Sequence, residues 1–189
     1  MVELYILRHG ETEWNRAGRM QGWLDSPLTE KGSAQAERQG ELLAAAGVGR
    51  HHRFWSSPQG RAWDTARLAL SRFGVPILRD DRLREIGIGD WSGLTRAEIA
   101  RLSGAPMDEL DDFFWMDAAP KGEGFAAVRA RARSFLNDLD GPAVIVTHAI
   151  LSRFLRAAVL DLDLEGAAGL PGGQGVVYRL VDGVMTKLG

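Results

Sequence analysis

Cysteine is missing from all 189 residues of the chain. Its absence excludes disulfides, thiolate zinc sites and a cysteine nucleophile. The chain also lacks a large excess of charge of either sign, because its 23 Lys and Arg nearly balance its 25 Asp and Glu and give a formal net charge of −2. This balance does not indicate a nucleic-acid or membrane surface. An anionic substrate would therefore need local positive charge rather than the field of the whole protein.

The sequence also lacks any apolar run long enough to cross a membrane. The first residues include Glu3 and Arg8 and contain neither a basic leader nor a long apolar stretch. We therefore expect no signal peptide and a cytoplasmic protein. The length suits one domain over residues 1–189, and no repeat, low-complexity segment or linker divides it.

Hydrophobic periodicity predicts strands that alternate with helices. A helix over residues 29–46 would have Thr29 as its N-cap and would bury Gly32, Ala36, Gln39 or Gly40, and Leu43. Strands are expected at residues 2–7, 53–55, 77–78 and 143–147, and a terminal hairpin at 175–181 and 184–188. Further helices are expected at residues 59–73, 94–102, 108–116, 125–139 and 150–159. This order predicts an α/β fold, a three-layer α/β/α sandwich with a mostly parallel central sheet.

In such sheets, ligands bind beyond the carboxyl ends of the strands. Arg8 and His9 follow the first predicted strand, Arg61 opens the helix after the second, and His148 follows the strand at 143–147. An arginine fork matches phosphate oxygens and stays charged at any working pH. The alternative for Arg61, a surface charge at a helix start, is weak because a cation there opposes the helix dipole. An anion between Arg61 and the helix end would remove that conflict.

Other polar residues have plainer alternatives. His51 and His52, beside Arg50 and Arg53, are expected to form a solvated basic patch. Glu85 lies among apolar residues and glycines, where a protonated carboxyl could give its proton to a leaving oxygen. A salt bridge from Glu85 to a neighbouring arginine, Arg82 or Arg84, is an equally simple interpretation.

Motifs of competing chemistries are absent. There is no G-x-x-x-x-G-K-[ST] loop, and Gly87-Ile88-Gly89 does not continue to G-x-G-x-x-G because Ser92 occupies the last place. No G-x-S-x-G elbow occurs. No H-E-x-x-H spacing supports a zinc site, so we expect neither a metal nor a cofactor.

The ordered motifs of the chain resemble the histidine phosphatase superfamily, the phosphoglycerate mutase-like fold. The resemblance rests on Leu7-Arg8-His9-Gly10-Glu11-Thr12, Trp14-Asn15, Gly18-Arg19-Met20-Gln21-Gly22, Asp25-Ser26-Pro27-Leu28-Thr29, Ser56-Ser57-Pro58, Arg61-Ala62, Thr65-Ala66, Leu83-Arg84-Glu85, Gly89-Asp90-Trp91-Ser92-Gly93 and Val144-Ile145-Val146-Thr147-His148. These blocks follow the family's order over nearly the whole chain. The chain departs from the family pattern at Ala149, where glycine is usual, and at Gly122-Glu123-Gly124, where Gly-Glu-Ser is usual.

The resemblance implies catalytic roles for five residues. His9 would accept the phosphoryl group, Glu85 would protonate the leaving oxygen, and a cage of Arg8, Arg61 and His148, the last as an imidazolium, would surround the phosphate. A second set is expected to bind substrate: Thr12, Asn15, Gln21, Gly22 and Ala149. For Thr12 the resemblance implies either contact with the substrate or orientation of the loop that carries Asn15, Gln21 and Gly22.

The resemblance favours a metal-independent phosphomonoester hydrolase with a phosphohistidine intermediate, acting on a small molecule. Phosphoglycerate mutase-type transfer and a non-catalytic phosphate-binding domain stay open as alternatives. Aromatic residues such as Trp14, Trp91 and Trp115 are candidates for an apolar pocket or for core. The sequence identifies neither the substrate nor the oligomeric state.

Overall fold

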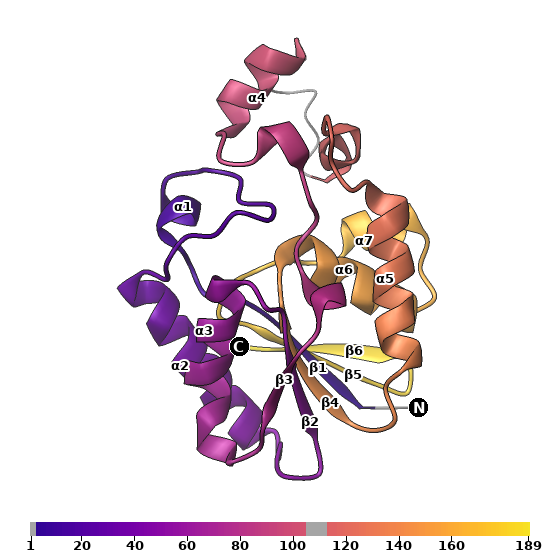
Figure 1. Cartoon of the computed structure of the whole chain (residues 1–189). Coiled ribbons are helices and arrows are strands. Elements are labelled where there is room, and N and C mark those ends of the chain that lie inside the picture. Colours follow the sequence, from indigo (N-terminus) through magenta and orange to yellow (C-terminus); the bar gives the residue numbers. More distant parts are fainter. Residues whose placement is uncertain (1–2, 105–112) are drawn as a thin grey trace.

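The computed structural model describes residues 3–104 and 113–189 (Figure 1). Within these ranges six strands form one sheet in the order β3-β2-β4-β1-β5-β6. The strands are β1 (Leu4–Arg8), β2 (Arg53–Ser56), β3 (Ile77–Arg79), β4 (Ala143–Thr147), β5 (Val177–Val181) and β6 (Val184–Leu188). The pairs among β1, β2, β3 and β4 are parallel, and β5 and β6 add an antiparallel edge. The prediction of a mostly parallel sheet is confirmed.

Helices cover both faces of the sheet (Figure 1). The α-helices are α1 (Glu13–Arg16), α2 (Glu30–Ala45), α3 (Gly60–Leu70), α4 (Arg96–Ser103), α5 (Phe125–Asn137), α6 (Ala149–Val159) and α7 (Leu164–Gly169), and short 3-10 helices span Ser71–Phe73, Asp81–Leu83, Gly89–Trp91 and Phe114–Ala118. Helices α2 and α3 lie against one face, and α5, α6 and α7 lie against the other. This is the predicted three-layer sandwich. No helix in the described ranges is long and apolar enough to span a lipid bilayer.

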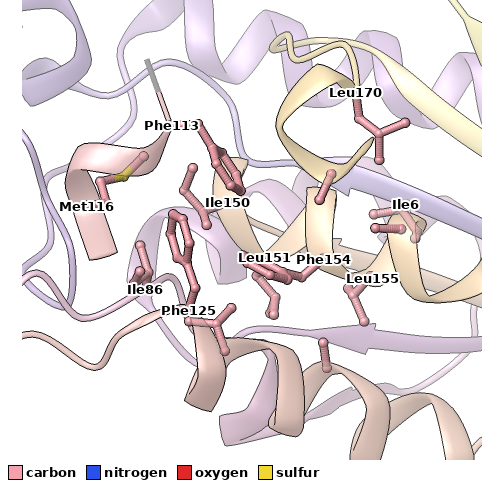
Figure 2. Packing of buried hydrophobic residues seen from close by; sticks show 14 of the residues in the cluster. Ile6, Ile86, Phe113, Met116, Phe125, Ile150, Leu151, Phe154, Leu155 and Leu170 are labelled. Atoms are coloured by element: carbon pink, nitrogen blue, oxygen red, sulfur yellow. The ribbon is translucent and has the colours of Figure 1, made fainter. Parts of the chain in front are cut away.

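The core has two parts because successive side chains of a strand point to opposite faces. Tyr5 and Leu7 of β1 pack in the cluster beneath α2 and α3, whereas Leu4 and Ile6 pack in the larger cluster beneath α5 and α6. Figure 2 shows this larger cluster, where side chains from both helices meet the sheet. A strand that is buried on both faces is apolar along its whole length, and β4 is buried at every position.

Helix α2 forms as its sequence predicts. The Thr29 hydroxyl accepts a hydrogen bond from the Gly32 amide at 3.0 Å and so caps the helix. The buried face consists of Gly32, Ala36, Gln39, Gly40 and Leu43, as predicted. Small residues are needed there because α3 packs closely: a β-carbon on Gly40 would lie 2.5 Å from the carbonyl oxygen of Ala69.

Several short elements differ from the prediction. Residue 2 of the first strand and most of the helix expected at 108–116 lie outside the described residues. The described end of that helix belongs to the 3-10 helix Phe114–Ala118. Helices α1 and α7 were not predicted, because each is short and depends on a capping side chain, Thr12 and Asp163 respectively.

The prediction of a solvated patch is wrong for His52, whose side chain is buried. Its ring lies edge-on to Tyr5, with ring centroids 5.6 Å apart, and its Nδ1 is 3.3 Å from the Gly49 amide. Burial and the adjoining His51 lower the pKa of His52. Its neighbour His51 is exposed, as expected.

Strand register places the predicted site residues side by side. Arg8 of β1 pairs with Thr147 of β4, and Ser56 of β2 pairs with Val146. The backbone hydrogen bonds of the sheet continue one residue further. The backbone amide of His9 donates to the Thr147 carbonyl, and the backbone amide of Ser57 donates to the Val146 carbonyl, each at 2.9 Å. The three strands therefore end at one level, where His9, Ser57 and His148 follow them.

Candidate active site

The loop that carries His9 is held tightly by its surroundings. A β-carbon on Gly10 would lie 2.2 Å from the carbonyl oxygen of Gly32 on α2, so no larger residue fits there without a backbone shift. The Gly10 amide donates to the Thr65 hydroxyl at 3.0 Å, and Gln39 donates to the Arg8 carbonyl at 2.9 Å. Glycine after His9 is thus required by the close approach of α2, and the loop has little freedom to move.

The His9 ring is oriented for reaction at Nε2. Its Nδ1 lies 2.7 Å from the Gly10 carbonyl, which can only accept, so Nδ1 carries the hydrogen and Nε2 the lone pair. Burial, together with the charges of Arg8 and Arg61, holds the pKa of His9 well below its ordinary value. Near neutral pH the ring is therefore uncharged, the form that a nucleophile requires.

The His148 ring lies next to the His9 ring. The two ring centroids are 5.2 Å apart, and His148 Nε2 is 2.8 Å from the hydroxyl of Ser57. Burial and the nearby charge of Arg61 hold the pKa of His148 well below its ordinary value. The imidazolium expected at this position is therefore not the form of the unliganded protein. A bound phosphoryl group would be needed to favour it.

Arg61 is a buried arginine that reaches from the first turn of α3 to His9. Its Nε donates to His9 Nε2 at 3.3 Å, and its other nitrogens donate to the carbonyls of Leu24 and Gly22 at 2.7 and 2.9 Å. The conflict with the helix dipole is offset by Asp25, whose Oδ1 accepts from both the guanidinium (2.9 Å) and the backbone amide (3.3 Å) of Arg61. The anion anticipated at this helix end is thus a side chain of the protein.

Glu85 faces the cavity from the other side, in the loop after the 3-10 helix Asp81–Leu83. Its carboxylate accepts from the backbone amides of Ile86, at 3.0 Å, and of Ile150 and Leu151 at the start of α6, both at 3.3 Å. Arg82 and Arg84 pair with other carboxylates, those of Asp80 and Asp138 for Arg82 and of Asp81 for Arg84. The structure therefore favours a site role for Glu85 over the alternative of a salt bridge.

His9, Arg61 and Glu85 border one cavity of about 270 Å³, whereas His148 lies next to His9 and is not among the residues that line it. Its polar walls include Arg8, His9, Arg61 and Glu85, and its apolar walls include Ile86, Ile88, Trp115, Met116 and Ile150. Arg8 differs from Arg61, because its buried Nε has no hydrogen-bond partner among the described residues. It therefore presents a donor that an anion in the cavity can use.

Four of the five residues expected to bind substrate line this cavity: Asn15, Gln21, Gly22 and Ala149. Thr12 does not. Its hydroxyl instead accepts a hydrogen bond from the backbone amide of Asn15 at 3.1 Å, and the backbone amide of Thr12 donates to the side-chain Oδ1 of Asn15 at 3.2 Å. The sequence left two roles open for Thr12, and this capping box favours orientation of the loop over contact with substrate.

The described residues contain no group of three or more His, Asp or Glu side chains arranged to hold a metal ion. Positive charge around His9 comes instead from Arg8 and Arg61, and the acidic member of the set is Glu85. A neutral imidazole, two guanidinium groups and one carboxyl at the carboxyl edge of a parallel sheet form an arrangement suited to phosphoryl transfer.

Comparison with known proteins identifies this arrangement. The family model of the histidine phosphatase superfamily (branch 1) matches residues 4–181.

The chain belongs to the histidine phosphatase superfamily.

Individual relatives extend over most of the chain. A glucosyl-3-phosphoglycerate phosphatase of Mycobacterium tuberculosis (strain CDC 1551 / Oshkosh) is 38% identical over 183 residues, which cover 89% of this chain and 80% of that protein. A 2,3-bisphosphoglycerate-dependent phosphoglycerate mutase of Corynebacterium diphtheriae is 33% identical over 94% of this chain and 86% of its own length. A mycobacterial glucosyl-3-phosphoglycerate phosphatase solved with VO3 has a TM-score of 0.81 at 35% identity and covers 96% of this chain and 91% of that one. The prediction of a phosphatase of this superfamily is confirmed.

The two departures from the superfamily pattern leave the local structure intact. Ala149 has no positive φ and begins α6 in ordinary helical backbone, so its methyl group introduces no backbone strain. Glu123 of the Gly122-Glu123-Gly124 segment pairs with Arg131 at 2.6 Å, and Arg131 donates to the carbonyls of Arg84 and Glu85. This pair therefore supports the loop that presents Glu85.

Sequence reasoning missed four residues that shape the site. Asp25 neutralises Arg61, Ser57 orients His148, and Arg153 lines the cavity. Gln59 donates to the Gly22 carbonyl at 2.9 Å and accepts from the Glu85 amide at 2.7 Å, so it joins the two sides of the cavity. Asp25 and Ser57 lie inside motifs already noted, but their partners are 36 and 91 residues away, which periodicity does not reveal.

Proposed function

We propose that the chain hydrolyses phosphomonoesters of small molecules through a phosphohistidine formed on His9, without a metal or cofactor. The observation that carries the proposal is the His9 ring itself. Its Nδ1 is fixed by the Gly10 carbonyl, its Nε2 faces Arg61, and burial holds its pKa low enough to keep it neutral. A neutral nitrogen with its lone pair aimed into a cavity walled by arginines is suited to attack a phosphorus atom.

In the first step, His9 Nε2 attacks phosphorus, the P–N bond forms, and the bond from phosphorus to the ester oxygen breaks. Glu85, in its protonated form, gives its proton to that leaving oxygen. Arg8 and Arg61 offset the charge on the three phosphoryl oxygens. The hydrogen bond from Arg61 Nε to His9 Nε2 must be exchanged for one to a phosphoryl oxygen, and its length of 3.3 Å indicates that it is weak.

In the second step, water attacks the phosphohistidine and the P–N bond breaks. Glu85 now takes a proton from that water, so the site returns to its starting state with phosphate released. The neutral His148 ring, 5.2 Å from His9 between ring centroids, would donate a hydrogen bond to a phosphoryl oxygen or take a proton from solvent as the phosphoryl charge arrives. Asn15, Gln21, Gly22 and Ala149 would contact the substrate, and Thr12 would orient their loop.

The same proposal covers the protein's setting. Residues 1–189 act as one domain, the site takes a small phosphorylated molecule rather than nucleic acid, and the location is cytoplasmic. The family match over residues 4–181 supports one domain, the balanced charge supports a small-molecule substrate over nucleic acid, and a chain without cysteine fits the cytoplasm.

The test is hydrolysis of p-nitrophenyl phosphate with EDTA present. Wild type is compared with His9→Ala and with the matched control His51→Ala, which removes an exposed histidine distant from the cavity. We expect activity in wild type and in His51→Ala, and none in a folded His9→Ala protein. Full activity in His9→Ala would overturn the mechanism. Activity on phosphoglycerates by phosphoryl transfer, without release of phosphate, would favour the mutase alternative.

A further inference from the structure

The loop over residues 171–175, just before β5, meets the N-terminal part of the chain beside the active site. The side-chain Nε2 of Gln174 donates to the side-chain Oδ1 of Asn15 at 3.0 Å, across 159 positions of the sequence. Asn15 and Gly172 both line the cavity that contains His9, whereas Gln174 is not among the lining residues. Any effect of Gln174 on the site would therefore act through Asn15.

Two hydrogen bonds fix the orientation of the Asn15 side-chain amide. A backbone N–H can only donate, so the atom of Asn15 that lies 3.2 Å from the Thr12 backbone amide is the oxygen. An amide oxygen has two lone pairs, and Gln174 Nε2 takes the second of them. A half-turn of the Asn15 amide would place its NH2 group against both of these donors.

This orientation leaves a hydrogen-bond donor for the cavity. Asn15 Nδ2 forms no hydrogen bond within residues 3–104 and 113–189. With Oδ1 turned toward Thr12 and Gln174, Nδ2 is the polar end of this side chain that can face the cavity. An N–H group suits the oxygens of a phosphoryl group, whereas an amide oxygen in the same place would repel them.

The loop that carries Gln174 is well placed to hold Asn15. The Tyr178 hydroxyl donates to the Gly172 carbonyl at 2.6 Å and so ties the loop to β5. Gly173 and Gly175 have φ angles of 137° and 74°, which other residues rarely adopt, so the backbone turns on both sides of Gln174. Helix α1 has only four residues and is too short to be stable alone, so contacts of this kind decide where Asn15 lies.

We propose that Gln174 is a positioning residue, which fixes Asn15 so that its Nδ2 donates to a phosphoryl oxygen. The amide adds a donor to those of Arg8 and Arg61 without adding charge to the cavity. A donor that is already oriented needs little rearrangement when the phosphoryl group arrives. This inference rests on the proposed function, since it assumes that the phosphoryl group lies beside His9.

The experiment is a double-mutant cycle between Gln174 and Asn15. Gln174→Met keeps the length of the side chain but removes its donor, and it is made both in wild type and in Asn15→Ala. The dissociation constant of inorganic phosphate is measured by calorimetry, and kcat/KM is measured for p-nitrophenyl phosphate. The control Tyr178→Phe, made in the same two backgrounds, removes another hydrogen bond of this loop but leaves both partners of Asn15 Oδ1 in place.

In wild type we expect Gln174→Met to raise the dissociation constant of phosphate and to lower kcat/KM, each about fivefold, the effect of one neutral hydrogen bond. In Asn15→Ala the same change should have an effect of less than about twofold on both, because the residue that it positions is missing. Tyr178→Phe should have equal effects in the two backgrounds. Equal effects of Gln174→Met in the two backgrounds, or no effect in wild type, would overturn the proposal.

Gln174→Glu is the second variant, and it tests the proposal even if Gln174→Met does not fold. Its carboxylate only accepts, so Asn15 would turn its NH2 group toward residue 174 and its oxygen toward the phosphoryl group. Phosphate binding should weaken about tenfold or more, and at least about threefold less in Asn15→Ala, where only the added charge acts. An equal loss in both backgrounds would overturn the proposal.

A wild-type protein that binds phosphate but does not hydrolyse p-nitrophenyl phosphate would contradict the proposed function and not this inference. The phosphate dissociation constants of the same proteins then decide the inference alone. A wild-type protein that does not bind inorganic phosphate would overturn it.

Discussion

Two buried histidines should make the stability of the protein fall steeply as the solution becomes mildly acidic. The pKa values of His9 and His148 lie well below their ordinary value of 6.5, because burial and nearby arginines disfavour the charged rings. In the unfolded chain both rings titrate near 6.5. Between that pH and the lower folded pKa, the unfolded chain binds protons that the folded protein refuses. Stability is therefore fully present above pH 6.5 and is lost as the pH falls toward the folded pKa.

The magnitude follows from the unfolded-state titration. Lowering the pH from about 6.5 to about 5.5 should reduce the free energy of unfolding by about 1 kcal/mol per histidine, or about 2 kcal/mol for His9 and His148 together. Most carboxylates begin to titrate only at lower pH. His52 adds a contribution of the same sign, since its pKa is also lowered.

The assay is urea unfolding at the two pH values in a buffer without phosphate, because an anion bound to the folded state would raise its stability. His148→Asn and His9→Asn should each reduce the pH dependence by about 1 kcal/mol relative to wild type. His51→Asn serves as the control for loss of a histidine at an exposed position. The contribution of His52 is common to wild type, His9→Asn and His148→Asn and cancels among these three, whereas His51→Asn also removes the charge that helps to lower the pKa of His52. An unchanged pH dependence in both His9→Asn and His148→Asn would refute the assignment of these rings as neutral and buried.

Three further predictions concern the site and its support. Glu85→Gln should slow a substrate with a poor leaving group, such as an alkyl phosphate, by at least about tenfold more than p-nitrophenyl phosphate, and equal losses in kcat/KM on both would contradict the acid role. Gln59→Leu leaves the backbone amide of Glu85 without its partner and removes one of the two donors to the Gly22 carbonyl, so it should lower kcat about tenfold or more while the protein stays folded by circular dichroism; a change in KM alone would count against this. Gly10→Ala should lower the free energy of unfolding, measured in urea, by about 3 kcal/mol, because its β-carbon would lie 2.2 Å from the Gly32 carbonyl oxygen. A loss below about 1 kcal/mol would contradict this, since it would mean that the loop moves away from α2 at little cost.

The parts of the fold that the sequence predicted are those with a strong local signal. β4 is apolar at every position but its last, Thr147, because both faces of the sheet are covered, and α2 has Thr29 at its start and a row of small residues on one side. The positions of His9 and His148 followed from the rule that parallel strands present their carboxyl ends to ligands. These predictions needed no knowledge of distant contacts.

What escaped prediction depends on contacts between distant parts of the chain. His52 was placed on the surface because its neighbours Arg50 and Arg53 are polar, but the ring packs against Tyr5 of another strand. Asp25 gave no local sign that it would meet Arg61, and Arg153 continues the polar side of α6 without any mark that this side faces a cavity. Local pattern indicates which residues are polar, whereas the fold decides which of them meet.

The state of His148 shows the same limit for chemistry. The resemblance implied an imidazolium in the phosphate cage, and only the three-dimensional surroundings reveal that burial and Arg61 keep the unliganded ring neutral. The ring would thus change its role when the phosphoryl group arrives.

The most direct test of the central claim is to trap the phosphorylated enzyme. Wild type is mixed with a rapidly hydrolysed phosphomonoester and quenched in alkali, where a phosphohistidine survives, and the digested protein is mapped by mass spectrometry. The account predicts one phosphoryl group on the peptide that contains His9, lost after brief acid treatment and missing from His9→Ala. A phosphoryl group on another residue would contradict it. Turnover with no trapped intermediate would also contradict it, under conditions in which hydrolysis of the phosphohistidine is the slow step.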